Sequence, residues 1–160
     1  MNYSLASTND IPALCQLLET LFSQEIEFSV DGDKQKQALE TILSDPEKAD
    51  VCIVKENNEV LGMVSLLYTT STALGGRVAI LEDMIIAPKY QGKGLGSELI
   101  NHAIKCAKEK DCLRITLLTD NDNQRAHRFY TKHGFEKSSM TAFRLLLNEK
   151  AQKKPQQCCG

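Results

Sequence analysis

The sequence contains no apolar run that approaches the roughly 18 residues of a membrane-spanning helix. It also lacks an excess of either charge, because its formal net charge at pH 7 is only -2. No overall basic field is therefore available to recruit nucleic acid or an anionic membrane. The first residues, Met1–Leu5, have neither a basic start nor a long apolar core. We therefore expect no signal peptide and a protein of the cytoplasm.

The cysteines lack the spacing of a metal site. None of them forms a Cys-x-x-Cys pair, and no pair of histidines flanks them at the spacing typical of zinc ligands. Cys15 and Cys106 fall in helical patterns and Cys52 falls in a strand pattern. We interpret these three as small core residues in a reducing compartment, and we predict no bound metal.

The size and composition of the chain suit one domain with one core. The chain has 160 residues, of which 42% are hydrophobic and 25% are charged, as is ordinary for a globular protein. We predict that residues 1–147 form the domain. Residues 148–160 are polar and rich in lysine and glutamine, which indicates a disordered tail.

The spacing of hydrophobic residues predicts an alternation of strands and helices. The expected strands are Tyr3–Ala6, Val51–Lys55, Val60–Tyr68, Arg77–Ile86, Leu113–Leu118 and Phe143–Leu147. The expected helices begin near Asp10 and then cover Lys34–Ser44, Leu95–Lys110 and Asp122–His133. The resulting order, β-α-α-β-β-β-α-β-α-β, predicts a single domain of the α/β (α+β) class.

The most informative segment is Gln91–Ser97, which joins an expected strand to an expected helix. Glycine lets the backbone run close to a ligand and exposes N–H groups, and the start of a helix adds a partial positive charge. This combination suits a pyrophosphate. The glycines at 92, 94 and 96 match neither the P-loop nor the Gly-x-Gly-x-x-Gly dinucleotide pattern. A flexible turn that only begins a helix would contain the same glycines.

A second segment places aromatic residues on one side of a helix. Ala126, Phe129 and Tyr130 share one face of the expected helix, and Asn123 lies on the same side. By itself this pattern is also typical of an amphipathic helix whose aromatic residues fill the core.

Together the two segments resemble the GNAT acyltransferase superfamily. The run from Gln91 to Gly96 matches the family signature Gln/Arg-x-x-Gly-x-Gly/Ala. The segment Asn123-x-x-Ala126-x-x-Phe129-Tyr130, followed by Gly134-Phe135, resembles its second motif. The likeness spans Val51 to Leu147 by element order, and in motif style it is closest to bacterial small-molecule amine acetyltransferases. It implies a mixed, mostly antiparallel central sheet flanked by helices.

The resemblance implies acetyl-CoA, or another acyl-CoA, as the donor. It assigns donor binding to Met84, Ile85, Ile86, Gln91, Gly92, Lys93, Gly94, Leu95, Gly96, Ser97 and Asn123. Backbone groups of the strand end would pair with the pantetheine arm as an added strand does. The amides of the glycine-rich segment would hold the diphosphate, and Lys93 would meet a CoA phosphate.

The implied reaction is acyl transfer to an amine. Glu82 resembles the glutamate that several small-molecule amine acetyltransferases, such as the polyamine enzymes, place here as a general base. An ion pair with Arg77 is the structural alternative for this residue, and we assign Asp83 to a structural hydrogen bond. A strand amide near Ile85 would stabilise the oxyanion if the strand splays or bulges there. Tyr130 would lie near the thioester sulfur.

The acceptor is less well defined by the sequence. Glu25 and Glu82 would give the cleft a negative potential that favours a cationic amine, so we expect a small-molecule amine substrate. Acetylation of a protein or peptide amine, and a non-catalytic acyl-CoA sensor, remain open. Dimers are frequent in the family, so the resemblance also allows a homodimer.

Overall fold

The computed structural model describes residues 1–24 and 31–147. Its strands are β1 (Asn2–Leu5), β2 (Ala49–Glu56), β3 (Glu59–Ser71), β4 (Gly76–Ile86) and β5 (Ile115–Leu117). Its helices are α1 (Ile11–Gln24), α2 (Gly32–Leu43), α3 (Leu95–Glu109) and α4 (Gln124–Lys132), with short 3-10 turns η1 (Thr8–Asp10) and η2 (Pro88–Tyr90). Within the described ranges, none of the helices combines the length and the apolar character that crossing a membrane requires.

The strands form one five-stranded sheet in the order β1-β2-β3-β4-β5. Neighbours from β1 to β4 are antiparallel, and β5 runs parallel to β4. This confirms the predicted α/β class with a mixed, mostly antiparallel sheet. The turn between β2 and β3 holds Asn57 and Asn58 at φ values of 48° and 65°, the left-handed conformation that tight hairpin turns require.

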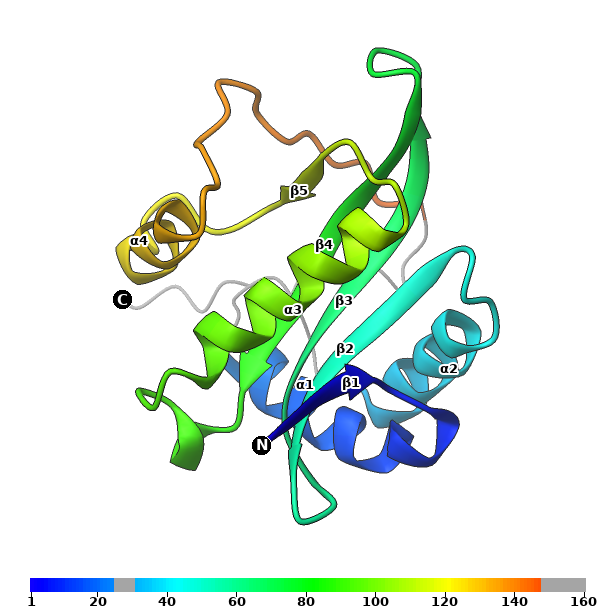
Figure 1. The fold of residues 1–160 in the computed structure, drawn as a ribbon, viewed down its shortest axis with the longest axis vertical. Coiled ribbons are helices and arrows are strands. Elements are labelled where there is room, and N and C mark those ends of the chain that lie inside the picture. The colour runs from blue at the N-terminus through cyan, green and yellow to red at the C-terminus, as the bar shows by residue number, and fades with distance from the viewer. Residues whose placement is uncertain (25–30, 148–160) are drawn as a thin grey trace.

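The helices cover both faces of this sheet (Figure 1). Helix α3 crosses one face, and α1 and α2 lie on the other. Successive residues of β2 point to opposite faces, so Cys52 packs with Leu99 under α3 whereas Ile53 packs with Leu14 under α1. The protein therefore has three layers with a core on each side of the sheet.

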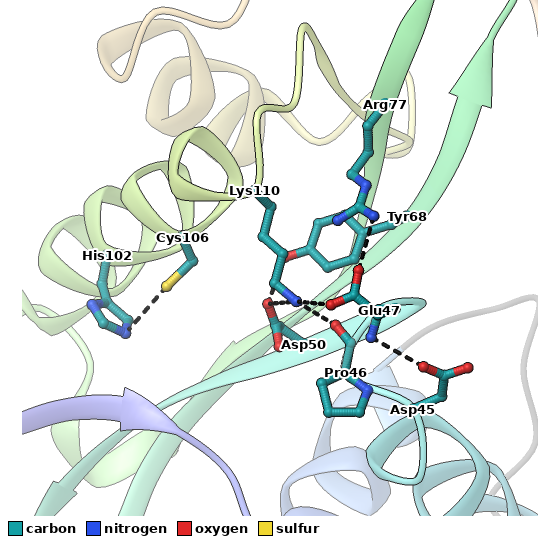
Figure 2. Close-up of polar contacts among 9 residues, drawn as sticks. All are labelled: Asp45, Pro46, Glu47, Asp50, Tyr68, Arg77, His102, Cys106 and Lys110. Carbon is teal, nitrogen blue, oxygen red and sulfur yellow. Dashed lines mark hydrogen bonds and ion pairs between the residues drawn. The ribbon is translucent and has the colours of Figure 1, made fainter.

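A group of polar contacts fastens the carboxyl end of α3 to the sheet (Figure 2). Lys110, which follows the helix, lies 3.9 Å from carboxylate oxygens of both Glu47 and Asp50. The Tyr68 hydroxyl donates a hydrogen bond of 2.7 Å to Asp50, and Arg77 pairs with Glu47 at 3.1 Å. Asp50 is only 6% exposed, so these partners compensate the cost of burying its charge.

The last predicted strand is wrong. Residues 136–147 form no helix or strand, and Phe143 is 95% exposed. A strand is stabilised mainly by cross-strand partners, and the described chain provides no neighbouring strand for Phe143–Leu147. The apolar residues there are consistent with a strand, but the described residues offer this segment no partner strand. The predicted tail 148–160 lies outside the described residues.

Candidate active site

A cleft of about 480 Å³ opens beside the carboxyl end of β4. In the described chain β4 pairs with β5 only over Ala79–Leu81, so the two strands are not joined further along. The wall of the cleft comes from the end of β4, the glycine-rich segment, α4 and the end of α1. Leu21 and Gln24 of α1 belong to it, although α1 and α3 cover opposite faces of the sheet. The cleft therefore connects the two faces through the gap between the strands.

Strand β4 bulges where it enters this cleft. Glu82 is opposite Ser65 and Ile85 is opposite Met63, so one residue of β3 faces two residues of β4. Asp83 lies at this point with a φ of 55°. A bulge bends the strand and leaves ladder groups unpaired. A bulge near Ile85 is the condition under which a strand amide was expected to stabilise the oxyanion, and Met84, Ile85 and Ile86 line the cleft.

The glycine-rich segment leaves backbone donors at the cleft. Gly92 and Gly94 have φ values of 76° and 84°, which residues with a side chain rarely adopt. Gly94 is the N-cap of α3 and provides no side-chain cap. The first bond within the helix runs from the Glu98 amide to the Gly94 carbonyl at 3.2 Å. The amides of Leu95, Gly96 and Ser97 therefore have no partner within the helix.

Two predicted donor-binding residues of this segment have structural contacts of their own. The side-chain amide Nε2 of Gln91 donates a hydrogen bond of 2.9 Å to the Ile86 carbonyl, so this residue ties the segment to the end of β4 while lining the cleft. The Lys93 ammonium lies 5.3 Å from the centre of the Tyr90 ring. Lys93 and Leu95 do not line the cleft with their side chains, whereas Tyr90 does.

The start of α4 forms the opposite wall. The Asn123 side chain accepts a hydrogen bond of 3.0 Å from the Ala126 amide and caps the helix. Arg125 also lines the cleft and brings a positive charge to it. Arg125 is not among the residues predicted from the sequence. The sequence feature that could have indicated it is its position two residues after Asn123, which caps α4.

Tyr130 is held between aromatic rings at the edge of the cleft. Its ring centre lies 5.2 Å from that of Phe129 and 5.6 Å from that of Phe135, and both pairs are edge-on. Burial raises the pKa of Tyr130 to about 12, so its hydroxyl keeps its proton at neutral pH. The structure thus presents a fixed, neutral hydrogen-bond donor at the cleft.

Glu82 is exposed and is not part of the cleft wall itself. Its cross-strand partner Ser65 is also the partner of Val51, which packs under α1, and cross-strand partners share a face. Glu82 therefore belongs to the α1 side of the sheet. Ser65 is 1% exposed, and its hydroxyl has no hydrogen-bond partner among the described residues. The predicted acidic residue Glu25 lies outside the described ranges.

His133 contacts Ser97, a residue of the predicted diphosphate site. Its Nε2 atom lies 3.1 Å from the Ser97 hydroxyl and its Nδ1 atom lies 3.2 Å from the Asn101 side-chain oxygen. Burial, and to a smaller extent the charge of Lys132, lower the pKa of His133. Nothing in the local sequence indicated this contact, because it joins the first turn of α3 to the end of α4.

Comparison with known proteins agrees with this geometry. The acetyltransferase (GNAT) family matches residues 11–135. The chain is 30% identical over 142 residues to the uncharacterized N-acetyltransferase YhfO of Bacillus subtilis, covering 87% of this chain and 92% of that one. It is 25% identical over 133 residues to the aminoalkylphosphonate N-acetyltransferase of Salmonella typhimurium, covering 83% of each.

A solved structure has the same fold. The predicted acetyltransferase with acetyl-CoA from Clostridium acetobutylicum aligns with a TM-score of 0.75 at 22% identity, covering 91% of this chain and 96% of that one. The family match spans most of the chain and includes both the glycine-rich segment and α4. The protein therefore belongs to the GNAT family of acetyltransferases and is an acyl-CoA-dependent N-acyltransferase.

Proposed function

We propose that the protein transfers the acetyl group of acetyl-CoA to the primary amine of a small cationic molecule, by direct attack in a ternary complex. One observation carries this proposal: a single cleft joins the free amides of α3, the bulged end of β4 and Tyr130. The related fold that was solved with acetyl-CoA supports the choice of donor.

The residues of the cleft fit this donor. Acetyl-CoA supplies an activated acyl carbonyl and a thiolate leaving group. The amides that follow Gly94, together with the partial positive charge at the start of α3, would hold its diphosphate. The backbone of Met84, Ile85 and Ile86 has no β5 partner, so it is available to pair with the extended arm. Arg125 and Asn123 would contact the donor from the α4 side.

Glu82 is proposed to accept the proton of the incoming ammonium through a water molecule. An ammonium such as that of lysine has a pKa near 10.4 and must lose a proton before it can attack. Glu82 stands on the α1 side of the sheet, outside the cleft wall, so a relay is needed. The Glu82 side chain is exposed, so solvent can supply the water of this relay.

Tyr130 is proposed to donate a hydrogen bond to the leaving sulfur. Its pKa of about 12 makes complete proton transfer to a thiolate of pKa near 8.5 uphill by about 5 kcal/mol. A hydrogen bond needs no such transfer and still stabilises the charge that develops on sulfur. The edge-on contacts with Phe129 and Phe135 would hold the hydroxyl in place.

The shape of the cleft supports the ternary complex. The donor would enter the cleft from the α3 side. The opposite end of the cleft is lined by Leu21 and Gln24 of α1, and the acceptor would bind there. The carboxylate of Glu82 would favour a cationic amine there. The relation to an aminoalkylphosphonate N-acetyltransferase also supports a small amine as the acceptor.

A homodimer is part of the proposal. Met140, Phe143, Leu145 and Leu147 are all more than four-fifths exposed and lie in one segment, which is unusual for the surface of a monomer. We propose that a second copy covers them. Light scattering on the purified chain should give a dimer mass, and Phe143→Lys combined with Leu145→Lys should give a monomer. A monomeric wild-type protein would contradict this part.

An acetylation screen tests the reaction. The protein is incubated with acetyl-CoA and polyamines, amino sugars, amino acids, aminoalkylphosphonates or lysine peptides, and product mass is followed because six cysteines would disturb a thiol assay. Preference for a cationic small amine is the expected result. Activity on peptides alone would overturn the substrate class, and CoA binding without any product would indicate a sensor.

The role of Glu82 has a matched control. Glu82→Gln should lower kcat with the preferred amine by roughly 100-fold, the lower range for loss of a general base. Glu56→Gln removes an exposed carboxylate at the end of β2 that does not line the cleft, and it should retain activity. Equal rates for both variants would remove Glu82 from the mechanism.

A further inference from the structure

Two cysteines and a histidine from distant parts of the chain meet between α3 and the sheet. His102 and Cys106 are four residues apart on α3 and therefore share a face of the helix. Cys52 of β2 packs under the same helix. The Cys106 sulfur lies 3.6 Å from His102 Nε2 (Figure 2). The ligand atoms of all three residues lie within 4.8 Å of one another.

We propose that Cys52, His102 and Cys106 form a zinc site. A tetrahedral zinc ion with Zn–S near 2.3 Å and Zn–N near 2.0 Å holds a sulfur and a nitrogen ligand roughly 3.5 Å apart. The observed separation of 3.6 Å between Cys106 and His102 is already close to this value. The remaining separations, all below 4.8 Å, require only small side-chain movements to close around one ion.

The charge balance selects a divalent ion. Cys52 is fully buried and Cys106 nearly so, so two thiolates there would be costly without compensation. Binding of Zn²⁺ releases the two thiol protons, and the two thiolates with one neutral imidazole then give a complex of zero net charge. A monovalent soft ion such as Cu⁺ would leave a negative charge in the core.

Cys52 and Cys106 of this site lie in the core under α3, away from the residues that line the cleft. The ring of Tyr3 lies 6.3 Å from that of His102, between centres, and packs against the same α3-side core as Cys52. The described residues provide three ligands, so the fourth position of the tetrahedron is left for water. None of the three residues lines the cleft. The ion would fasten the middle of α3 to β2 without entering the acetyl transfer reaction.

The proposed zinc site contradicts the prediction, made from the sequence, that the protein binds no metal. The spacing rules apply to ligands that lie close together in the chain, whereas here 49 or more residues separate Cys52 from the two helical ligands. Only the packing of α3 on β2 brings them together.

Metal binding by the full chain tests the inference. The untagged protein carries Cys158→Ser and Cys159→Ser, which remove the two thiols near the carboxyl terminus. It is kept reduced with a reductant that contains no thiol and is then dialysed against Zn²⁺ alone. One zinc ion per chain is expected. Co²⁺ in place of Zn²⁺ should give the absorption band of sulfur-to-cobalt charge transfer. This band reports thiolate ligands without any substitution of the ligand residues, so it does not depend on whether a ligand variant folds.

Variants assign the ligands. His102→Gln and Cys106→Ser should each weaken zinc binding, measured by competition with a chelator, by more than the roughly 10–100-fold that loss of an outer-shell partner costs. Cys112→Ser removes a half-buried thiol outside the cluster and should leave the affinity unchanged. Absence of saturable zinc binding, of the cobalt absorption, or of any loss in His102→Gln would overturn the site. None of these outcomes bears on the proposed acetyl transfer, which is measured separately.

Discussion

The two ends of helix α3 have opposite character. At its start, Gly94 adopts a left-handed conformation, no side chain caps the helix, and backbone amides face a cleft. At its end, Lys110 is surrounded by Asp50, Glu47 and the Tyr68 ring, and polar groups are paired. The first end keeps its hydrogen-bond donors for a ligand, and the second uses its polar groups to hold the helix on the sheet. Binding and stability are therefore separated along one helix.

The largest effect is expected from Tyr130→Phe at the cleft end. Loss of the hydroxyl should lower kcat by about 100-fold or more, because the leaving sulfur loses its hydrogen-bond donor, while the Kd of CoA stays within twofold. Steady-state kinetics and calorimetry check the two values. Tyr68→Phe is the matched control, since its hydroxyl binds Asp50 at the opposite end of α3. A Tyr130→Phe enzyme with normal turnover would exclude this residue from the mechanism.

The second prediction addresses the other end of the helix. Asp50→Ala leaves the Tyr68 hydroxyl without its acceptor and removes one of the partners of the Lys110 ammonium, so it should lower the free energy of unfolding by about 2–3 kcal/mol. Urea denaturation measures this change, and the Kd of CoA should not change at a temperature where the variant is folded. The exposed carboxylate variant Glu136→Ala should be neutral. A large loss of CoA affinity in Asp50→Ala would show that the two ends are coupled.

A third prediction separates folding from binding at the start of α3. A Cβ added at Gly96 would lie 3.7 Å from Met84, Ile86 and Phe129, an ordinary contact distance, so Gly96→Ala should fold normally. The new methyl group stands at the wall of the cleft and should raise the Kd of CoA about tenfold, equal to about 1.4 kcal/mol. Gly32→Ala, where nothing lies within 4 Å, is the control. Unchanged CoA affinity would contradict the diphosphate assignment.

The smallest effect concerns His133 and pH. Because burial lowers its pKa below 6.5 in the folded chain, the unfolded chain binds more protons between the two pKa values. Stability should therefore fall as the pH decreases from 6.5 through the folded-state pKa. His133→Gln should flatten this part of the profile, measured by thermal unfolding at several pH values. An equally steep profile in the variant would assign the dependence to other groups.

Local patterns predicted much of the fold and the cleft. The glycine-rich segment and the order of the strands up to β5 follow from spacing and turn chemistry, which depend on neighbouring residues. The strand predicted for Phe143–Leu147 is absent because a strand also needs a partner, and an apolar segment has the same sequence with or without one. The bulge at Asp83 was not predicted, because its presence and position depend on how β3 pairs with β4.

Other features depend on contacts that no single segment contains. Ser65 is noticed only when the cross-strand register places it opposite Glu82. His133 reaches Ser97 because α4 packs beside α3. The three residues of the proposed zinc site come from β2 and α3, so neither segment indicates a metal ligand set by its own spacing.

The uncapped start of α3 has a consequence for the life of the protein in the cell. Under the proposed function, the donor completes the first turn of the helix in the way that a serine or aspartate side chain does elsewhere. Each empty molecule would then open at this turn more readily than a loaded one, and hydrogen exchange at Leu95, Gly96 and Ser97 would slow on saturation. Starvation for the thioester would thus shorten the survival of the enzyme against proteases, and its abundance would follow the supply of its own co-substrate.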